Sequence, residues 1–171
     1  TDNGIRMLVW TSDIPERATG NHTAVVYSLY DEESSSWSEP TIIDDDGTAD
    51  FCPNVATDGT SIFVAWMDSN TDEFEENVTI GELASSCEIN VAIYDFVNRQ
   101  FNVVTLTNNT TVDFNPVVYP NNGHAYVAWI NNSENDILAL NGTNTVFYSE
   151  FSGSSCGSVV TISAYEQPVS G

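Results

Sequence analysis

The sequence contains no lysine and only three arginines, against 25 aspartates and glutamates, which gives a formal net charge of −22 over 171 residues. Proteins that bind DNA or RNA use cationic side chains to displace counterions from the phosphates. We therefore expect no nucleic-acid partner. An anionic membrane surface would repel the chain for the same reason, and no apolar run approaches the roughly 20 residues of a membrane-spanning helix. Membrane insertion is not expected either.

Cysteine is also scarce, with three residues, and the first residues lack the basic start and apolar run of a secretory signal peptide. Either a signal has been removed or the chain is part of a larger protein. Hydrophobic residues make up 41% of the sequence, enough to form a core, which argues against a disordered acidic tail. No helical periodicity of useful length is visible.

The polar surface is built from Ser, Thr and Asn, which is typical of proteins outside cells. Such chains are glycosylated at Asn-x-Ser/Thr sequons. Six sequons occur, at Asn21, Asn77, Asn108, Asn109, Asn131 and Asn141. We expect an extracellular or cell-surface location, with these six asparagines as candidate glycosylation sites.

An internal repeat indicates the fold. The segment SIFVAW at 61–66 reappears as HAYVAW at 124–129, and in weaker form as RMLVW at 6–10. Upstream, FCPNV at 51–55 matches FNPVV at 114–118, and each proline lies thirteen residues before its tryptophan. Downstream, a Tyr-Asp pair is followed by an aromatic residue seven positions after the tyrosine in two copies.

Each repeated segment is short, rich in β-branched and aromatic residues, and bounded by Gly, Asn, Asp or Pro, which predicts strands. The central copy predicts strands at 53–57, 61–67, 88–95 and 100–106. The turns at 58–60 and 121–123 each contain a glycine that tolerates positive φ, as tight hairpins require. A repeated four-stranded antiparallel meander predicts an all-β protein made of β-propeller blades.

The Val-Ala-Trp strand, the Tyr-Asp hairpin, WSEP at 37–40 and DGTADF at 46–51 resemble tandem propeller repeats of secreted and surface-anchored bacterial proteins. These are distantly similar to sialidase-like propellers, which carry a Ser-x-Asp-x-Gly-x-Thr-Trp hairpin. The sequence departs from that pattern, because Asp31 precedes Trp37 by six residues instead of five and the glycine is absent. The resemblance implies secretion, but many functions occur on such blades.

We expect about three blades: one at 5–43 that lacks its first strand, one at 51–107, one at 114–163, and a lone strand at 166–170. Propellers typically have ~4–8 blades, so three cannot close a ring. The predicted partner is either the remaining blades of a larger propeller, which we favour, or a second copy that completes a six-bladed ring.

In such a meander the long connections emerge on one face of the ring and the tight hairpin turns on the other. All six sequons lie on the long-loop face, as do many carboxylates, including those at 44–46, 50, 72, 73, 75 and 76. Function concentrates on long loops held by a rigid scaffold, which favours this acidic face for recognition. The alternative is that the loops are simply solvated.

The best metal candidates are Asp44, Asp46 and Asp50, since closely spaced carboxylates around a glycine turn can supply oxygens to calcium. Their spacing does not match the EF-hand loop, and the alternative that we favour is a solvated acidic turn, because charge runs usually lie on the surface. Cys52 and Cys87 are expected on the same face of one blade, which makes them the natural disulfide pair. Cys156, in an opposite turn, is expected to be free or to pair outside this sequence.

Two functions remain open. The first is an extracellular binding or scaffold module that meets a protein, a glycan or calcium through the acidic loops. The second is the non-catalytic portion of a secreted carbohydrate-active enzyme, such as a sialidase-like protein or a glycoside hydrolase. Arg6, Arg17 and Arg99 do not occupy corresponding repeat positions, so the arginine cluster of sialidases is not expected, and no catalytic residue is assigned.

Overall fold

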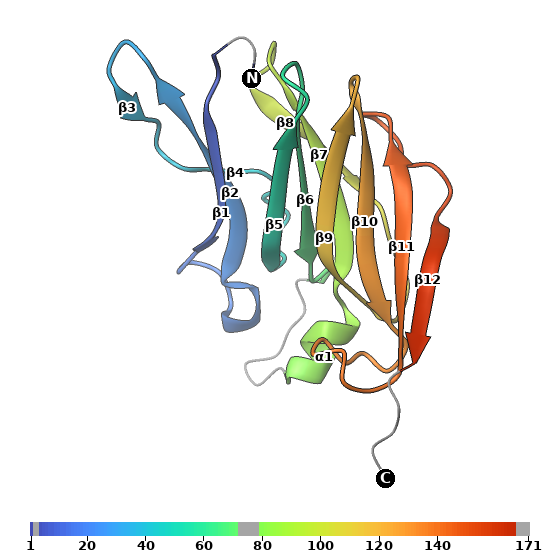
Figure 1. Cartoon of the computed structure of the whole chain (residues 1–171). Coiled ribbons are helices and arrows are strands. Elements are labelled where there is room, and N and C mark those ends of the chain that lie inside the picture. Colours follow the sequence, from blue (N-terminus) through green and yellow to red (C-terminus); the bar gives the residue numbers. More distant parts are fainter. Residues whose placement is uncertain (2–3, 72–78, 167–171) are drawn as a thin grey trace.

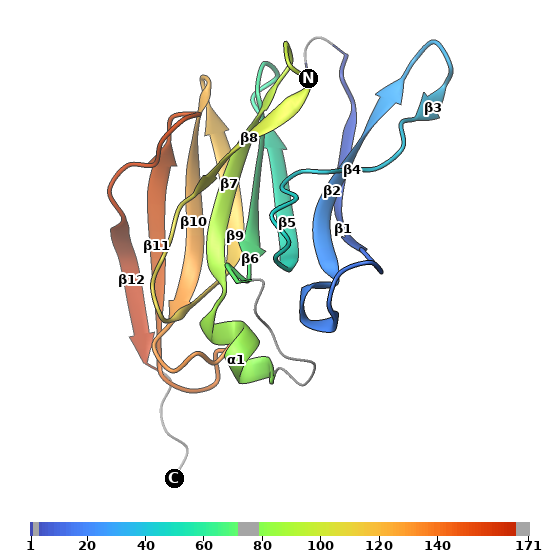
Figure 2. The same ribbon diagram turned by 180° about the vertical axis from the view of Figure 1, so that it is seen from behind.

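The computed structural model, which describes residues 1, 4–71 and 79–166, contains three four-stranded antiparallel sheets that stand side by side (Figures 1 and 2). The second and third sheets are simple meanders. The first sheet comprises β1 (Met7–Asp13), β2 (Thr23–Asp31), β3 (Ser36–Trp37) and β4 (Thr41–Ile42). The second comprises β5 (Asp50–Thr57), β6 (Ile62–Asp68), β7 (Glu88–Asp95) and β8 (Gln100–Thr105). The third comprises β9 (Val112–Asn121), β10 (His124–Asn132), β11 (Thr143–Phe151) and β12 (Val160–Glu166).

The prediction of an all-β chain built from repeated four-stranded sheets is confirmed. In the first sheet β3 and β4 both pair with β2 and are separated by 38–40, where Pro40 has no N–H to donate to a neighbouring strand. The lone strand expected at 166–170 lies outside the described residues, except for Glu166, which ends β12.

The tight turns also follow the sequence. Gly59 has a φ of 93° in the β5–β6 hairpin, and in the β9–β10 hairpin Asn122 and Gly123 have φ values of 51° and 82°. These are the left-handed conformations that Gly and Asn tolerate best. The Gly123 N–H donates to Asp58 Oδ2 at 2.8 Å, so the two neighbouring hairpins are also hydrogen-bonded to each other.

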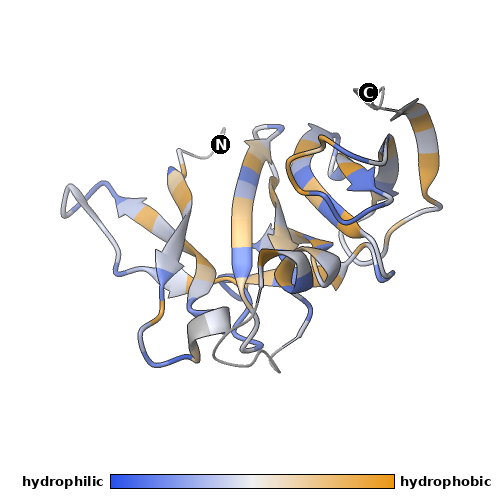
Figure 3. Cartoon of the chain, turned by 90° about the horizontal axis from the view of Figure 1, so that it is seen from below, coloured by the Kyte–Doolittle hydropathy of each residue, from blue (hydrophilic) through white to orange (hydrophobic). Residues whose placement is uncertain are grey.

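The sheets pack face to face in a regular way, and Figure 3 shows them as an arc seen from below. We call the side of each sheet that carries the repeated tryptophan its tryptophan face, and the other side its opposite face. The tryptophan face of the second sheet, with Trp66 and Val64, packs on Val25 and Tyr27 of the first sheet. The tryptophan face of the third sheet packs on the opposite face of the second. That core includes Val127, Trp129 and Phe151 from the third sheet and Phe63, Ala65, Met67 and Val91 from the second.

One helix was missed by the sequence analysis. It is α1 (Ile80–Ser85), which lies in the connection from β6 to β7. Thr79 caps it, because its hydroxyl accepts a hydrogen bond from the Glu82 N–H while the Glu82 carboxylate accepts one from the Thr79 N–H. This capping box stabilises a helix too short to show periodicity. No helix in the described part of the chain is long and apolar enough to cross a membrane.

Candidate functional site

The long connections gather at one end of the three sheets, where α1 lies, and the tight hairpin turns gather at the other end (Figure 1). This is the arrangement expected from a meander. We call the end with α1 the long-loop face. Between β1 and β2 it carries the short 3₁₀ helix Thr19–Asn21, and between β10 and β11 it carries the loop 133–142.

A buried carboxylate holds the repeated tryptophan at this end of the second and third sheets. Trp66 Nε1 donates to Asp50 Oδ1 at 2.7 Å, and Trp129 Nε1 donates to Asp113 Oδ1 at 3.0 Å. In both sheets the acid lies sixteen residues before the tryptophan. Asp50 also joins two sheets, because its Oδ2 accepts the N–H of Val25 in β2 at 2.9 Å. Pairing with fixed donors offsets part of the cost of burying a carboxylate.

A β-bulge opposite each tryptophan brings these groups together. The register shifts between Phe51 and Asn54 in β5, and the same shift occurs in β9 opposite Trp129. The first bulged residue has positive φ in both strands, 51° at Cys52 and 53° at Asn115. A bulge bends its strand and redirects side chains, which is how the preceding acid reaches the indole.

The loops that lead into β5 and β9 share a hydrogen-bonded turn. Thr48 donates both its N–H and its hydroxyl to Asp46 Oδ1, at 2.9 and 2.6 Å. Thr111 makes the same pair of bonds to Asn109 Oδ1, at 2.8 and 2.7 Å. Only an acceptor oxygen is needed at the first position, so an aspartate in one loop corresponds to an asparagine in the other.

Several acidic side chains lie close together around the loop that leads into β5, with little positive charge near them. Burial, and then the charge of Asp46 and Asp68, raises the pKa of Asp44 to about 6. Burial raises the pKa of Asp50 to about 8, although the Val25 N–H and the indole of Trp66 favour its ionised form. The pKa of Asp68 is raised as well, again mainly by burial. The folded protein therefore tends to retain protons here that an unfolded chain would release.

A single arginine lies among these carboxylates. One nitrogen of Arg17 contacts Asp45 Oδ1 at 2.6 Å, and another donates to the Thr48 carbonyl at 2.6 Å. Asp68 is held by neutral donors: its Oδ1 accepts the Asn70 N–H at 2.9 Å and its Oδ2 accepts from Asn90 Nδ2 at 2.5 Å, while the Thr48 hydroxyl oxygen lies 2.7 Å from Oδ1. Asp45, Asp46 and Asp68 thus make hydrogen bonds that fix these loops.

Calcium at Asp44, Asp46 and Asp50 stays a prediction. Both oxygens of Asp50 accept protein donors, and one oxygen of Asp46 accepts two. No group of three His, Cys, Asp or Glu side chains placed to hold a metal ion occurs within the described ranges.

The six sequons are placed very differently. Asn21 is buried, and Asn109, Asn131 and Asn141 donate their side-chain amides to neighbouring oxygens. Asn108 is exposed. Asn77 and the acids at 72–76 lie outside the described residues. Glycosylation at each of the six sequons stays a prediction.

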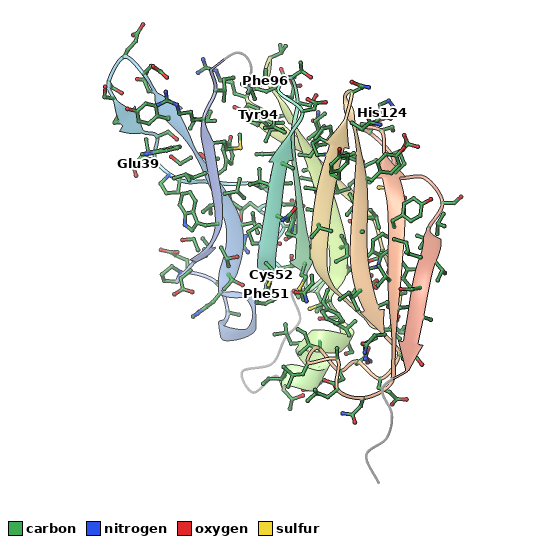
Figure 4. All side chains as sticks on the ribbon, in the orientation of Figure 1. Glu39, Phe51, Cys52, Tyr94, Phe96 and His124 are labelled. Carbon is green, nitrogen blue, oxygen red and sulfur yellow. The ribbon has the colours of Figure 1, made fainter. Side chains whose placement is uncertain are left out.

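The expected Cys52–Cys87 disulfide is absent, since all three cysteines are free thiols. Cys52 is exposed at the bulge of β5, next to Phe51 (Figure 4). Cys87 is buried, and its thiol donates to the Leu83 carbonyl at 3.2 Å. Burial raises the pKa of Cys87 to about 12, with smaller effects of Asp68, Glu88 and Cys52. The side chain of Cys87 is held by α1 rather than by a partner cysteine.

Large aliphatic side chains are exposed on the long-loop face, and the sequence analysis missed them. They are Ile80 of α1 and Ile137, Leu138 and Leu140 of the loop 133–142. Both segments pack on the same core cluster, α1 through Ala84 and the loop through Ala139. The signal was visible in the sequence as the apolar run ILAL between Asp136 and Asn141. We call these four residues the aliphatic patch.

A cleft of about 560 Å³ lies at the other end, between the first and second sheets. Tyr94 and Phe96 line it, with ring centroids 5.2 Å apart, and Arg99 lies at its edge. Figure 4 shows both rings near the hairpin turns.

No family model matches the chain, and no curated protein matches it either. The resemblance to sialidase-like repeats remains a prediction from the motifs.

Proposed function

We propose that the three sheets are blades of a β-propeller and that the chain is an extracellular binding module which recognises a protein partner through its long-loop face. The propeller assignment is supported by the repeated packing of a tryptophan face on the opposite face of the preceding sheet. It is also supported by the repeated acid–tryptophan bond, which places the first strand of the second and third sheets in the same way. A rigid stack of sheets with long loops at one end is the arrangement from which binding surfaces are commonly built.

The aliphatic patch is the observation that carries the proposal. An exposed apolar group rimmed by polar residues is a feature of protein interaction sites. The neighbouring acids Glu82 and Asp136 border the patch in sequence. With a net charge of −22, the chain attracts partners of opposite sign. We infer a partner that presents apolar side chains surrounded by lysine or arginine.

Calcium and catalysis have less support. Two of the three carboxylates of the metal prediction, those of Asp46 and Asp50, are bonded to protein donors, as described above. The two histidines lie at opposite ends: His22 follows the 3₁₀ helix of the long-loop face, and His124 Nδ1 contacts Glu150 Oε1 at 3.3 Å at the hairpin-turn end.

Carbohydrate binding is the second candidate, and the cleft lined by Tyr94 and Phe96 favours it. Aromatic rings with a few polar groups are typical of small-molecule sites of this volume. This would fit the non-catalytic portion of a secreted carbohydrate-active enzyme.

The experiment compares defined probes and matched variants. An amphipathic peptide of leucine and lysine, and one of leucine and glutamate, are titrated against the protein by fluorescence anisotropy at low and high salt. We expect the lysine peptide alone to bind, and to bind more weakly at high salt. The double variant Leu138→Ser/Leu140→Ser is expected to weaken binding about tenfold or more, because apolar anchors dominate such interfaces.

The matched control is Val97→Ser, an exposed apolar residue in the β7–β8 turn at the other end. It should bind as wild type does. Absence of binding, or equal loss in both variants, refutes recognition by the long-loop face. A glycan array with and without calcium tests the second candidate, which requires a glycan signal that Phe96→Ala removes and the patch variant retains.

A further inference from the structure

The chain contains two interfaces in which the tryptophan face of one sheet packs on the opposite face of the preceding sheet. The two outermost sheet faces are one face of each kind. At one end of the arc the tryptophan face of the first sheet leaves Leu8 and Trp37 exposed, although Ala24, Val26 and Ser28 of β2 on that face are buried. At the other end the third sheet leaves its opposite face uncovered. Inside the chain, a tryptophan face always packs on an opposite face. Each outer face can therefore be compared with its buried equivalent in the second sheet.

The tryptophan face of the first sheet repeats that of the second. Aligning Trp10 with Trp66 makes Leu8 equivalent to Val64, and aligning the two Tyr-Asp hairpins makes Trp37 equivalent to Phe101. Leu8 is 49% exposed where Val64 is 0%, and Trp37 is 43% exposed where Phe101 is 8%. The side chains keep the apolar character of a packed face while lacking the neighbour that buries it.

The opposite face of the third sheet shows the same relation. Strand pairing places Val117, Ala128, Tyr148 and Val160 in one row across all four strands. The equivalent row of the second sheet is Asn54, Ala65, Val91 and Val104, and it packs against the third sheet. In the next row Tyr126 is 38% exposed, whereas its equivalent Phe63 is fully buried.

The internal interface shows which rows would meet. Phe63 of the second sheet packs edge to face on Phe151 of the third, with ring centroids 6.2 Å apart. Phe151 pairs directly with Ala125, and Ala125 aligns with Arg6 of the first sheet. The row that holds Arg6 would therefore face the row that holds Tyr126. That second row also contains Glu150, which pairs with Tyr126.

Charge complementarity supports the match. The rows described on the third sheet carry one acid, Glu150, although the chain has 25. The facing row on the first sheet carries Arg6, which is exposed, contacts Glu32 Oε1 at 2.8 Å and stacks on Tyr30 with its guanidinium carbon 5.0 Å from the ring centroid. A cation and an anion thus occupy corresponding rows on the two faces, with Glu32 beside Arg6 and His124 beside Glu150.

We propose that two copies of this chain associate head to tail, each placing the tryptophan face of its first sheet on the opposite face of its partner's third sheet. The two contacts close a ring of six sheets, within the ~4–8 typical of propellers. Such an interface uses different surfaces on the two partners and closes only when the rotation permits. The proposal rests on the propeller part of the proposed function and not on the aliphatic patch.

The experiment measures mass in solution by sedimentation velocity over a wide range of concentrations. Wild type is expected at twice the chain's 18.7 kDa. Arg6→Glu and Glu150→Arg, each alone, should raise the dissociation constant about tenfold or more, because like charges would face each other across the contact. The double variant Arg6→Glu/Glu150→Arg should restore association, which a merely unfolded variant would not do.

A second variant, Tyr148→Arg, places a charge in the centre of the apolar row and should give a monomer with unchanged far-UV circular dichroism. Val97→Asp, on an exposed turn, should dimerise as wild type does. A monomer at every concentration overturns the proposal, as do open-ended oligomers or a failure of the charge swap. Peptide binding by the aliphatic patch is measured separately, so its outcome does not depend on this one.

Discussion

Substituting Asp50 with asparagine should change how the stability of the protein depends on pH. The carboxyl group is almost fully buried, and its pKa is raised to about 8 from 3.8. Between these values the folded state holds a proton that the unfolded state has released, so raising the pH favours unfolding. The contribution is complete below about pH 3.8 and is lost as the pH rises through 8.

The size of the effect follows from linkage. One proton corresponds to about 1.4 kcal/mol per pH unit, so Asp50 alone should lower the free energy of unfolding by about 2.5 kcal/mol between pH 5 and pH 7. Asp44, whose pKa is raised to about 6, and Asp68 act in the same direction. The wild-type protein should therefore be more stable at pH 5 than at pH 7.

The assay is urea unfolding, followed by tryptophan fluorescence, at pH 5, 6 and 7. Asp50→Asn keeps an acceptor for Trp66 but does not titrate, so its slope should be shallower than that of wild type by about 1.4 kcal/mol per pH unit. Asp95→Asn, at the end of β7, is the control and should keep the wild-type slope, because the pKa of Asp95 is lowered and the group stays ionised over this pH range. Parallel slopes for wild type and Asp50→Asn, or a wild-type stability that increases from pH 5 to pH 7, would refute the argument.

Two further predictions concern the bulges and the thiols. Cys52→Gly should stabilise the protein by about 0.5–1 kcal/mol, because glycine adopts the positive φ of this position without steric cost. Asn115→Gly should stabilise it less, since asparagine already tolerates positive φ. The urea midpoints of the two variants are compared, and equal gains in stability would contradict this reasoning. A thiol reagent at neutral pH should label Cys52 rapidly and leave Cys87 unlabelled until the protein is denatured, because Cys87 is buried and its pKa is about 12. Recovery of a Cys52–Cys87 disulfide in peptides from non-reduced protein would contradict the structure.

The strands were predictable because their repeat is strong. The strand expected at 88–95 coincides with β7, and the expected aromatic partners pair directly, Tyr30 with Trp37 and Tyr94 with Phe101. Alternating apolar residues bounded by turn residues leave few alternatives for such segments. The same regularity predicted the positions of the two glycine hairpins.

The site was less predictable, for identifiable reasons. The bond from Trp66 to Asp50 depends on a bulge, and bulges leave no distinct pattern in the alternation of side chains. Helix α1 is six residues long, too short for periodicity, although its Thr79 and Glu82 form a recognisable capping box. The cysteine pairing was inferred from topology alone, which does not specify where a thiol points.

The turn formed by Asp46 in one loop and by Asn109 in the next makes the same hydrogen bonds whether or not its acceptor residue can ionise. Both residues fix the following threonine through one acceptor oxygen, so the backbone is indifferent to whether that oxygen belongs to an acid or an amide. Exchanging aspartate and asparagine at this position can therefore change the charge of the long-loop face while the hydrogen bonds of the turn are kept.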